Sequence, residues 1–159
     1  VYFTDVHVPT ENLVGVEGEA FKQTMRQLEH ERGGIDRLVS NKALYDEALK
    51  YANTDDPLTR QEISTLESGY RIGKLLVYRE VLRQAPAGFS AATKCFCTEH
   101  EWRVAQFVNR ILGPEATLDT HTSRGLAYAP AYTIMGGTSN IMRNILGERC
   151  LGLDREPRG

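Results

Sequence analysis

The sequence of 159 residues is 41% hydrophobic and carries 19 basic and 21 acidic side chains, which gives a formal net charge of −2. A chain of this length can bury one hydrophobic core and has little room for two. The near-neutral charge argues against a surface for nucleic acid or for an anionic membrane, because both require an excess of Lys and Arg. No apolar run approaches the roughly 20 residues that a membrane-spanning helix needs.

The cysteines and histidines form no metal-ligand pattern. The chain has three cysteines, Cys95, Cys97 and Cys150, which cannot all pair within it. A single residue separates the first two, which is closer than the usual spacing of zinc ligands, and the four histidines are scattered. We therefore expect no metal site and reduced thiols, with the cytoplasm as the compartment.

The first residues have strand character. Hydrophobic and polar side chains alternate in two short pieces over residues 1–9 and stop at Pro9. The chain starts at Val1 with neither a Met nor the pattern of a signal peptide, so it reads as a sequence entered in mid-strand. A glycine-containing connector follows, up to Gly18.

A long helical pattern begins near Glu19 and continues to Leu49, with apolar side chains along one broad stripe. The pair Gly33-Gly34 lies inside it. Each glycine costs a helix up to about 1 kcal/mol relative to alanine. We therefore expect the pair to serve the close approach of a ligand or of another helix.

Four further helices are predicted, over residues 57–84, 90–112, 123–129 and 141–151. Asp56 is suited to cap the first of them and Pro57 to occupy its first position. Gly113 and Pro114 end the helix before them, and Pro130 interrupts the weaker third pattern. Amphipathic helices joined by short connections predict an all-α, up-and-down four-helix bundle.

Two places could carry chemistry. The first is Gly136-Gly137-Thr138-Ser139 at the start of the last helix. Glycines let the backbone approach a ligand, and the free N–H groups of a first helical turn attract anions or carbonyl oxygens. An ordinary helix start with Thr138 or Ser139 as the N-cap explains the same pattern.

The second place is the charged run Glu29-His30-Glu31-Arg32, which precedes the glycine pair and interrupts an apolar stripe. In general, a carboxyl group in an apolar, glycine-lined space has its pKa raised towards neutrality, as a general base requires. Most charged residues on a helix are simply solvated, and that interpretation stays open here.

At these residues the sequence resembles the acyl-CoA dehydrogenases. Residues 1–15 resemble the end of that family's middle β-domain, and residues 18–22 resemble the start of its first C-terminal helix. Residues 136–144 (Gly-Gly-Thr-Ser-Asn-Ile-Met-Arg-Asn) are similar to a Glu-Gly-Thr-Ser-Glu-Ile-Gln-Arg segment near the end of these flavoenzymes. Residues 147–158 resemble actinobacterial members, some of which act on steroid side chains as heteromeric assemblies.

The resemblance implies a domain organisation and a reaction. Residues 1–16 would be the end of the β-domain and a connector, residues 17–152 the C-terminal helical bundle, and residues 153–159 a polar tail. The implied reaction is the FAD-dependent oxidation of an acyl-CoA thioester to the trans-2-enoyl-CoA. The implied partners are an electron-transfer flavoprotein and further subunits, in a homo- or hetero-oligomer formed through the helical bundle.

The resemblance also implies site residues. The usual base precedes Gly-Thr-Ser, where this chain has Gly136, but isovaleryl-type members carry the base in a Leu-x-x-Glu-Arg segment of the first long helix. Leu28 to Arg32 matches that segment, so Glu31 is the predicted base. The backbone N–H of Gly136 is the predicted donor to the thioester carbonyl, and Arg32 is predicted to bind the substrate.

The predicted FAD contacts are Gly137, Thr138, Ser139 and Asn140. Two departures from the family pattern affect this side of the site. Asn140 replaces the usual acidic residue, and residues 53–57 stand where most members have an Arg-x-x-Phe-Gly segment whose arginine reaches the flavin of a neighbouring subunit.

Two alternatives stay open. Gly136 and the shortened connection at residues 53–57 favour a catalytically silent subunit of a heteromeric dehydrogenase, in which the helices form an assembly surface. Without the resemblance, a helical scaffold that buries its apolar stripe against a partner would also fit. The Gly-Gly-Thr-Ser run and the strand-like start weigh against the scaffold.

Overall fold

The computed structural model describes residues 1–118 and 120–155. Within these ranges the chain forms seven α-helices and two short 3₁₀-helices, and no residue of these ranges lies in a strand. The elements are η1 (Thr10–Asn12), α1 (Ala20–Arg32), α2 (Asp36–Val39), α3 (Lys42–Leu49), α4 (Pro57–Val81), α5 (Ser90–Leu112), η2 (Gly113–Thr117), α6 (His121–Tyr132) and α7 (Ser139–Cys150). The predicted all-α class is confirmed.

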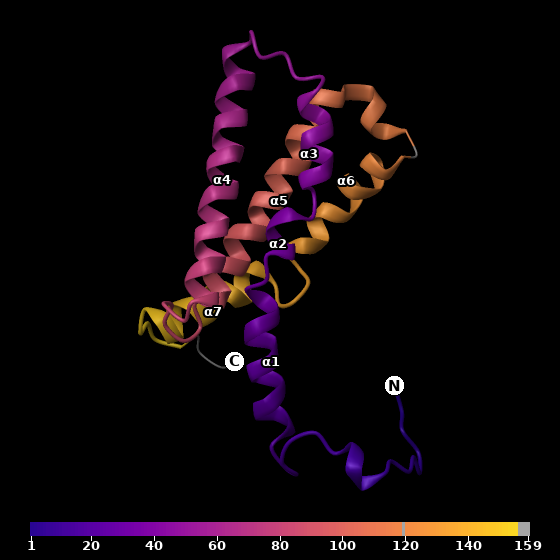
Figure 1. Cartoon of the computed structure of the whole chain (residues 1–159), viewed down its shortest axis with the longest axis vertical. Helices are drawn as coiled ribbons and strands as arrows, with labels where there is room; N and C mark the ends of the chain where they lie inside the picture. Colours follow the sequence, from indigo (N-terminus) through magenta and orange to yellow (C-terminus); the bar gives the residue numbers. More distant parts are fainter. Residues whose placement is uncertain (119, 156–159) are drawn as a thin grey trace.

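Helix α5 is the centre of the bundle. It contacts each of the other α-helices, from α1 to α4 and then α6 and α7. Figure 1 shows α4, α5 and α6 running along the long axis of the molecule, with α1, α2 and α3 following one another as a fourth, interrupted rod. Helix α7 lies across the lower end of this bundle. The predicted up-and-down four-helix bundle is therefore confirmed, with α7 added at one end.

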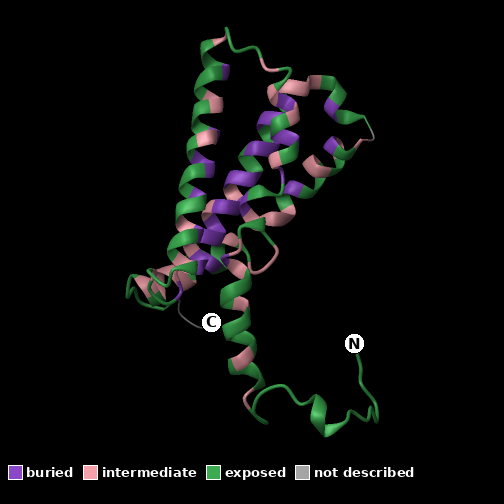
Figure 2. Ribbon diagram, in the orientation of Figure 1, coloured by how far each residue is buried: buried purple, intermediate pink, exposed green. Residues whose placement is uncertain are grey.

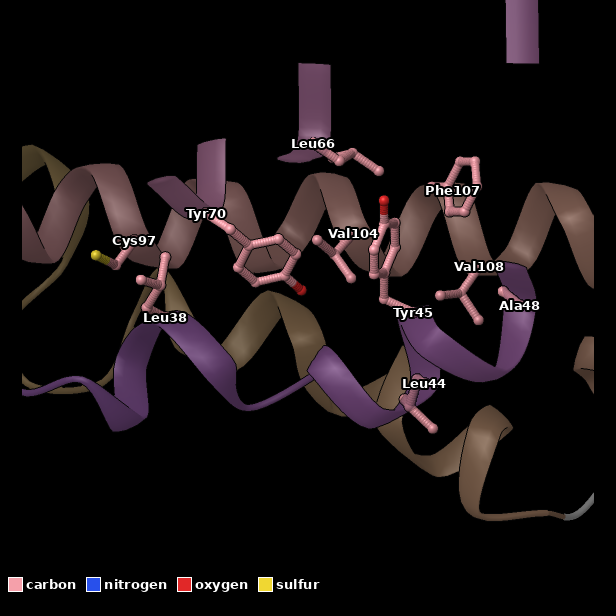
Figure 3. Close-up of a cluster of buried hydrophobic side chains, with 10 residues drawn as sticks. All are labelled: Leu38, Leu44, Tyr45, Ala48, Leu66, Tyr70, Cys97, Val104, Phe107 and Val108. Carbon is pink, nitrogen blue, oxygen red and sulfur yellow. The ribbon is translucent and has the colours of Figure 1, made fainter. Parts of the chain in front are cut away.

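The main hydrophobic core lies where α2, α3 and α4 meet α5 (Figure 3). Tyr45, which is fully buried, stands between two other aromatic rings, with centroids 5.6 Å from Tyr70 and 5.6 Å from Phe107. Such tilted aromatic pairs add to the free energy gained from burial. Leu38 and Val104 fill the space beside them. This core fixes α2 and α3, and through them the end of α1, against α5.

The long helix predicted from Glu19 to Leu49 is not continuous in the structure. Helix α1 ends at Arg32, and α2 begins four residues later. A side chain at Gly33 would collide with the carboxylate of Glu80 on α4, so the close approach that the glycine pair predicted comes from another helix. A second break follows at Asn41, whose N–H donates to Oε2 of Glu101 on α5 at 2.5 Å.

Helix boundaries follow local chemistry. Asp56 accepts hydrogen bonds from the N–H groups of Leu58 and Thr59, and Pro57 opens α4, as predicted. Helix α4 ends at Val81 and not near residue 84, because Arg83 has a positive φ of 56°. Helix α6 is longer than predicted, since the capping box of Thr120 starts it earlier and the backbone stays helical through its proline.

The strand predicted over residues 1–9 is wrong for this structure. These residues are exposed, and a strand needs a neighbouring strand to bind its backbone, which the described chain does not supply. They lead through η1 into α1, which projects from the bundle and has no buried residue (Figure 2). Of the predicted polar tail, residues 153–155 are exposed and residues 156–159 lie outside the described ranges.

Candidate active site

Three of the residues predicted from sequence meet at the junction of α1, α2 and the loop that joins α6 to α7. Nε of Arg32, the last residue of α1, donates a hydrogen bond to the carbonyl oxygen of Gly136 at 3.0 Å, although 104 positions separate them. Glu31 immediately precedes Arg32. The structure therefore brings the predicted base, the predicted substrate-binding arginine and the predicted carbonyl donor into one place.

A residue that the sequence interpretation did not select, Arg37, joins this group. Its Nη2 atom lies 3.2 Å from Oε1 of Glu31 and would lie 3.8 Å from a side chain at Gly136. Residues i and i+6 of one continuous helix point about 120° apart. Because the chain breaks at Gly33-Gly34, Arg37 instead turns back towards Glu31. The glycine pair was the sequence signal that could have indicated this contact.

Glu31 and Arg37 differ in their exposure. The side chain of Glu31 is 51% exposed, whereas that of Arg37 is 17% exposed. The carboxylate is thus reachable from outside this chain, while its cationic partner is largely enclosed. The sequence predicted an apolar space around the base. The residues of this chain enclose the Glu31 carboxylate only in part.

The loop between α6 and α7 is closed at its base by its own backbone. The N–H of Ser139 donates to the carbonyl oxygen of Thr133 at 2.9 Å. Gly136 and Gly137 have φ values of +67° and +96°, a region that residues with a side chain rarely adopt. A side chain at Gly137 would also come within 2.5 Å of Cε of the buried Met142. Both glycines are therefore required by the backbone path.

The start of α7 combines a structural cap with unused donors. Oγ1 of Thr138 accepts from the N–H of Ile141 at 3.2 Å, so Thr138 is the N-cap, as one of the two interpretations predicted. Within the described chain, no hydrogen bond engages the N–H groups of Gly136 and Gly137. Capping accounts for Thr138 but leaves these two donors available to a ligand.

A cationic cavity of about 290 Å³ lies next to this junction, between α1, the start of α5 and α7. Arg32 lines it together with three further cationic side chains, and Glu29 is its single carboxylate. The lining residues are Lys22, Met25, Arg26, Glu29, Arg32, Gly88, Ser90, Ala91, Ile145 and Arg149. We call this space the cationic cavity. Its charge suits an anionic group such as a phosphate.

The described residues show neither a metal cluster nor a membrane-spanning helix. No group of three or more His, Cys, Asp or Glu side chains in residues 1–118 and 120–155 could hold a metal ion. None of the helices in these ranges is long and apolar enough to cross a membrane. The three cysteines are free thiols.

The described residues thus form an all-α domain in which a glycine loop is held against a Glu-Arg pair. The sequence profile of the family described as "Acyl-CoA dehydrogenase, C-terminal domain" matches residues 18–151. The chain therefore belongs to the acyl-CoA dehydrogenase family.

Individual relatives agree with this assignment. The chain is 28% identical to the acyl-CoA dehydrogenase IpdE1 of Mycobacterium tuberculosis, with 100% of this chain and 45% of the relative covered. It is 27% identical to the acyl-CoA dehydrogenase FadE29 of the same organism, with 99% and 46% covered. In the solved ChsE4-ChsE5 complex from Mycobacterium tuberculosis, one chain superposes with a TM-score of 0.80 at 25% identity, with 98% of this chain and 46% of that chain covered. The present chain spans less than half the length of these relatives.

Members of this family generally use FAD, and the junction fits one edge of such a group. At Gly136, Nη2 of Arg37 at 3.8 Å is the only atom of the described residues within 4 Å of a hypothetical side chain, so the backbone is open on that side. The N–H groups of the two loop glycines are unused, and the side chains of Thr138 and Asn140 are exposed at the start of α7. Ser139 contributes differently, because its backbone closes the loop.

Proposed function

We propose that the protein containing these residues oxidises an acyl-CoA thioester to the trans-2-enoyl-CoA. In this proposal Glu31 removes the α-proton and the N–H of Gly136 donates to the thioester carbonyl. The observation that carries the proposal is the 3.0 Å hydrogen bond from Arg32 to the carbonyl of Gly136. It holds the helix with the candidate base against the loop with the candidate donor.

The chemistry that these groups would perform follows from the weak acidity of a thioester α-proton. As a carboxylate oxygen of Glu31 takes the proton, negative charge develops on the thioester oxygen. A backbone N–H already aimed at that oxygen stabilises the charge without reorganising, which is the larger part of such catalysis. When bound, FAD supplies the acceptor for the hydride that leaves the β-carbon.

The two arginines have separate roles in this proposal. Arg37 orients the Glu31 carboxylate through the 3.2 Å ion pair. Arg32 fixes the loop and lines the cationic cavity, where it would hold an anionic part of CoA. Because the side chain of Glu31 is 51% exposed in these residues, the bound substrate and the rest of the protein would have to exclude water from it.

The cofactor and the partners belong to the same proposal. Gly137, Thr138, Ser139 and Asn140 would contact FAD, and an electron-transfer flavoprotein would accept the electrons. Apolar side chains on the exposed face of α4, at Ile72, Leu75, Tyr78 and Val81, support assembly with identical or different subunits through the bundle. Free thiols support the cytoplasm as the compartment.

A catalytically silent subunit of a heteromeric dehydrogenase is the second candidate. Two observations favour it: the exposed Glu31 is already paired with Arg37, and a glycine stands where the usual base would be. In that case, the helices described here would contribute an assembly surface. The relative described as the ChsE4-ChsE5 complex is itself an assembly of two named components.

The experiment that tests the base uses the full-length protein together with any subunit that copurifies with it. Glu31→Gln should abolish the bleaching of the flavin by acyl-CoA while FAD stays bound. Glu62→Gln, which also replaces a carboxylate by an amide, is the matched control, since Glu62 lies on α4, pairs with Arg110 and lines neither the junction nor the cationic cavity. Unchanged bleaching in Glu31→Gln would remove Glu31 as the base. A complex in which no flavin belongs to this subunit would support the silent alternative.

A further inference from the structure

Lys94 is an almost fully buried lysine at the start of the central helix. Its relative exposure is 1%, and its Nζ atom donates to the carbonyl oxygen of Thr133 at 3.3 Å. No carboxylate of the described chain forms an ion pair with it. An ammonium group without a counter-ion is costly to bury, so its presence in the core needs a reason.

The carbonyl that Lys94 binds is the one that closes the glycine loop. The same Thr133 oxygen accepts the N–H of Ser139 at 2.9 Å, so it connects the last turn of α6 to the first turn of α7. Another loop carbonyl that is bound from outside the loop is that of Gly136, which accepts from Arg32 at 3.0 Å. Two cations from two different helices thus hold two carbonyls of one short loop.

These contacts restrict the path of the loop, and the contact at Gly136 sets the direction of one of its donors. In a trans peptide the N–H lies opposite the preceding carbonyl, so the bond from Arg32 to the Gly136 carbonyl sets the direction of the Gly137 N–H. The backbones of Gly136 and Gly137 are flexible, because glycine has no side chain and can adopt many conformations. Without contacts from outside the loop, their N–H groups would not keep one direction.

We propose that Lys94 is a positioning residue, whose ammonium group fixes the loop of residues 133–139 so that the unused N–H groups of Gly136 and Gly137 face the reacting carbonyl. This inference rests on the proposed function for the identity of that carbonyl. The holding of the loop itself does not depend on it. Lys94 touches neither substrate nor cofactor in this scheme and acts through the backbone of Thr133.

The surroundings of Lys94 make its role sensitive to alkaline pH. Burial lowers its pKa below the ordinary lysine value, and the cations Arg37 from α2 and Arg32 from α1 lower it further. Cys95 and Glu99, on α5 itself, act in the opposite direction. Loss of the proton weakens the hydrogen bond to Thr133, because a bond from a charged donor is stronger than one from a neutral amine.

The test compares Lys94→Met with Lys74→Met, the same replacement of an exposed lysine on α4, in the full-length protein. If Lys94 had only a structural role, removal of an unpaired buried charge would leave stability unchanged or raised and the loop unaffected. We expect instead that amide hydrogen exchange over residues 133–139 becomes at least ten-fold faster. We also expect kcat for acyl-CoA oxidation to fall between about ten- and a hundred-fold at an unchanged KM.

A second variant separates charge from packing. Lys94→Arg keeps a donor that stays protonated, so it should restore loop protection and remove the alkaline fall of kcat that we expect of the wild-type protein. Unchanged exchange in Lys94→Met overturns the proposal. If Lys94→Met does not fold, the pH dependence of kcat decides instead. An alkaline fall of kcat that is the same in the wild-type protein and in Lys94→Arg overturns the proposal equally. A wild-type protein without acyl-CoA dehydrogenase activity would refute the proposed function, while loop exchange would still decide the role of Lys94.

Discussion

Nη2 of Arg37 lies 3.2 Å from Oε1 of Glu31, six residues earlier in the chain, and the two side chains meet across a break in the helix. The contact depends on Gly33-Gly34, because an unbroken helix would point the side chains in different directions. Arg37 is also the side chain nearest to the open face of Gly136. It therefore lies beside both the candidate base and the candidate donor loop.

Replacing Arg37 by methionine should separate its effect on catalysis from its effect on stability. The Glu31 carboxylate is half exposed, so the ion pair contributes at most about 1 kcal/mol to folding. The loss of an orienting partner should slow reduction of the flavin by acyl-CoA about ten-fold, because misplaced reacting groups lower the rate. Stopped-flow absorbance of the full-length protein measures this rate.

Arg71→Met, an exposed arginine of α4, is the matched control for that variant and should change neither rate nor stability. A rate of flavin reduction equal to that of the wild-type protein would show that Arg37 does not orient the base. Loss of bound FAD in Arg37→Met would point to a role in cofactor retention.

Gly137→Ala should destabilise the domain and disturb the loop. The backbone φ of +96° disfavours a side chain, and the added methyl group would come within 2.5 Å of Cε of Met142, which is fully buried. We expect a loss of about 1–3 kcal/mol in the free energy of unfolding. Urea unfolding followed by circular dichroism measures it.

Gly147→Ala is the control for this glycine variant, since Gly147 lies in α7 and an added methyl group would make an ordinary contact of 3.5 Å with Leu153. It should stabilise the helix by up to about 1 kcal/mol. If Gly137→Ala and Gly147→Ala changed the free energy of unfolding equally, the backbone of the loop would tolerate a side chain at Gly137.

The chain of residues 1–159, produced alone, should be helical but colourless and inactive. Its core around Tyr45 and Phe107 is complete within the bundle, so the helices should form without other domains. The chain spans less than half of its relatives and would offer FAD only one edge of a site. Circular dichroism and visible absorbance test both statements, and tight stoichiometric FAD binding by this chain would contradict the second.

The sequence predicted the positions of the helices better than it predicted the contacts between them. Periodicity and caps such as Asp56 located α4 and α5, because these signals are local. Resemblance selected Glu31, Arg32 and Gly136 separately, but no sequence pattern showed that Arg32 reaches a carbonyl 104 positions away. Arg37 was missed for a similar reason, since its position depends on how the chain turns at the glycine pair. The buried Lys94 was missed because a lysine on a helix is usually solvated.

Glu101 should make the stability of the bundle depend on pH. It is fully buried on α5, Oε2 accepts the N–H of Asn41, and in the described chain Oε1 has no hydrogen-bond partner. Burial raises its pKa from 4.5 to about 8, although the bond from Asn41 opposes the shift. The folded state thus binds more protons than the unfolded state between these two values. The stabilising contribution is complete below pH 4.5 and is lost as the pH rises through about 8.

Glu101→Gln should remove this dependence, because the amide has nearly the same shape, can still accept from Asn41 and carries no charge. Between pH 5 and pH 8 the free energy of unfolding of the wild-type chain should fall by roughly 1.4 kcal/mol per pH unit relative to the variant. Glu62→Gln, at the surface of α4, is the matched control and should keep the wild-type slope. Thermal unfolding over this pH range measures the difference. Parallel curves for Glu101→Gln and the wild-type chain would show that Glu101 is already ionised in the folded bundle, which would require a cation or water to reach Oε1.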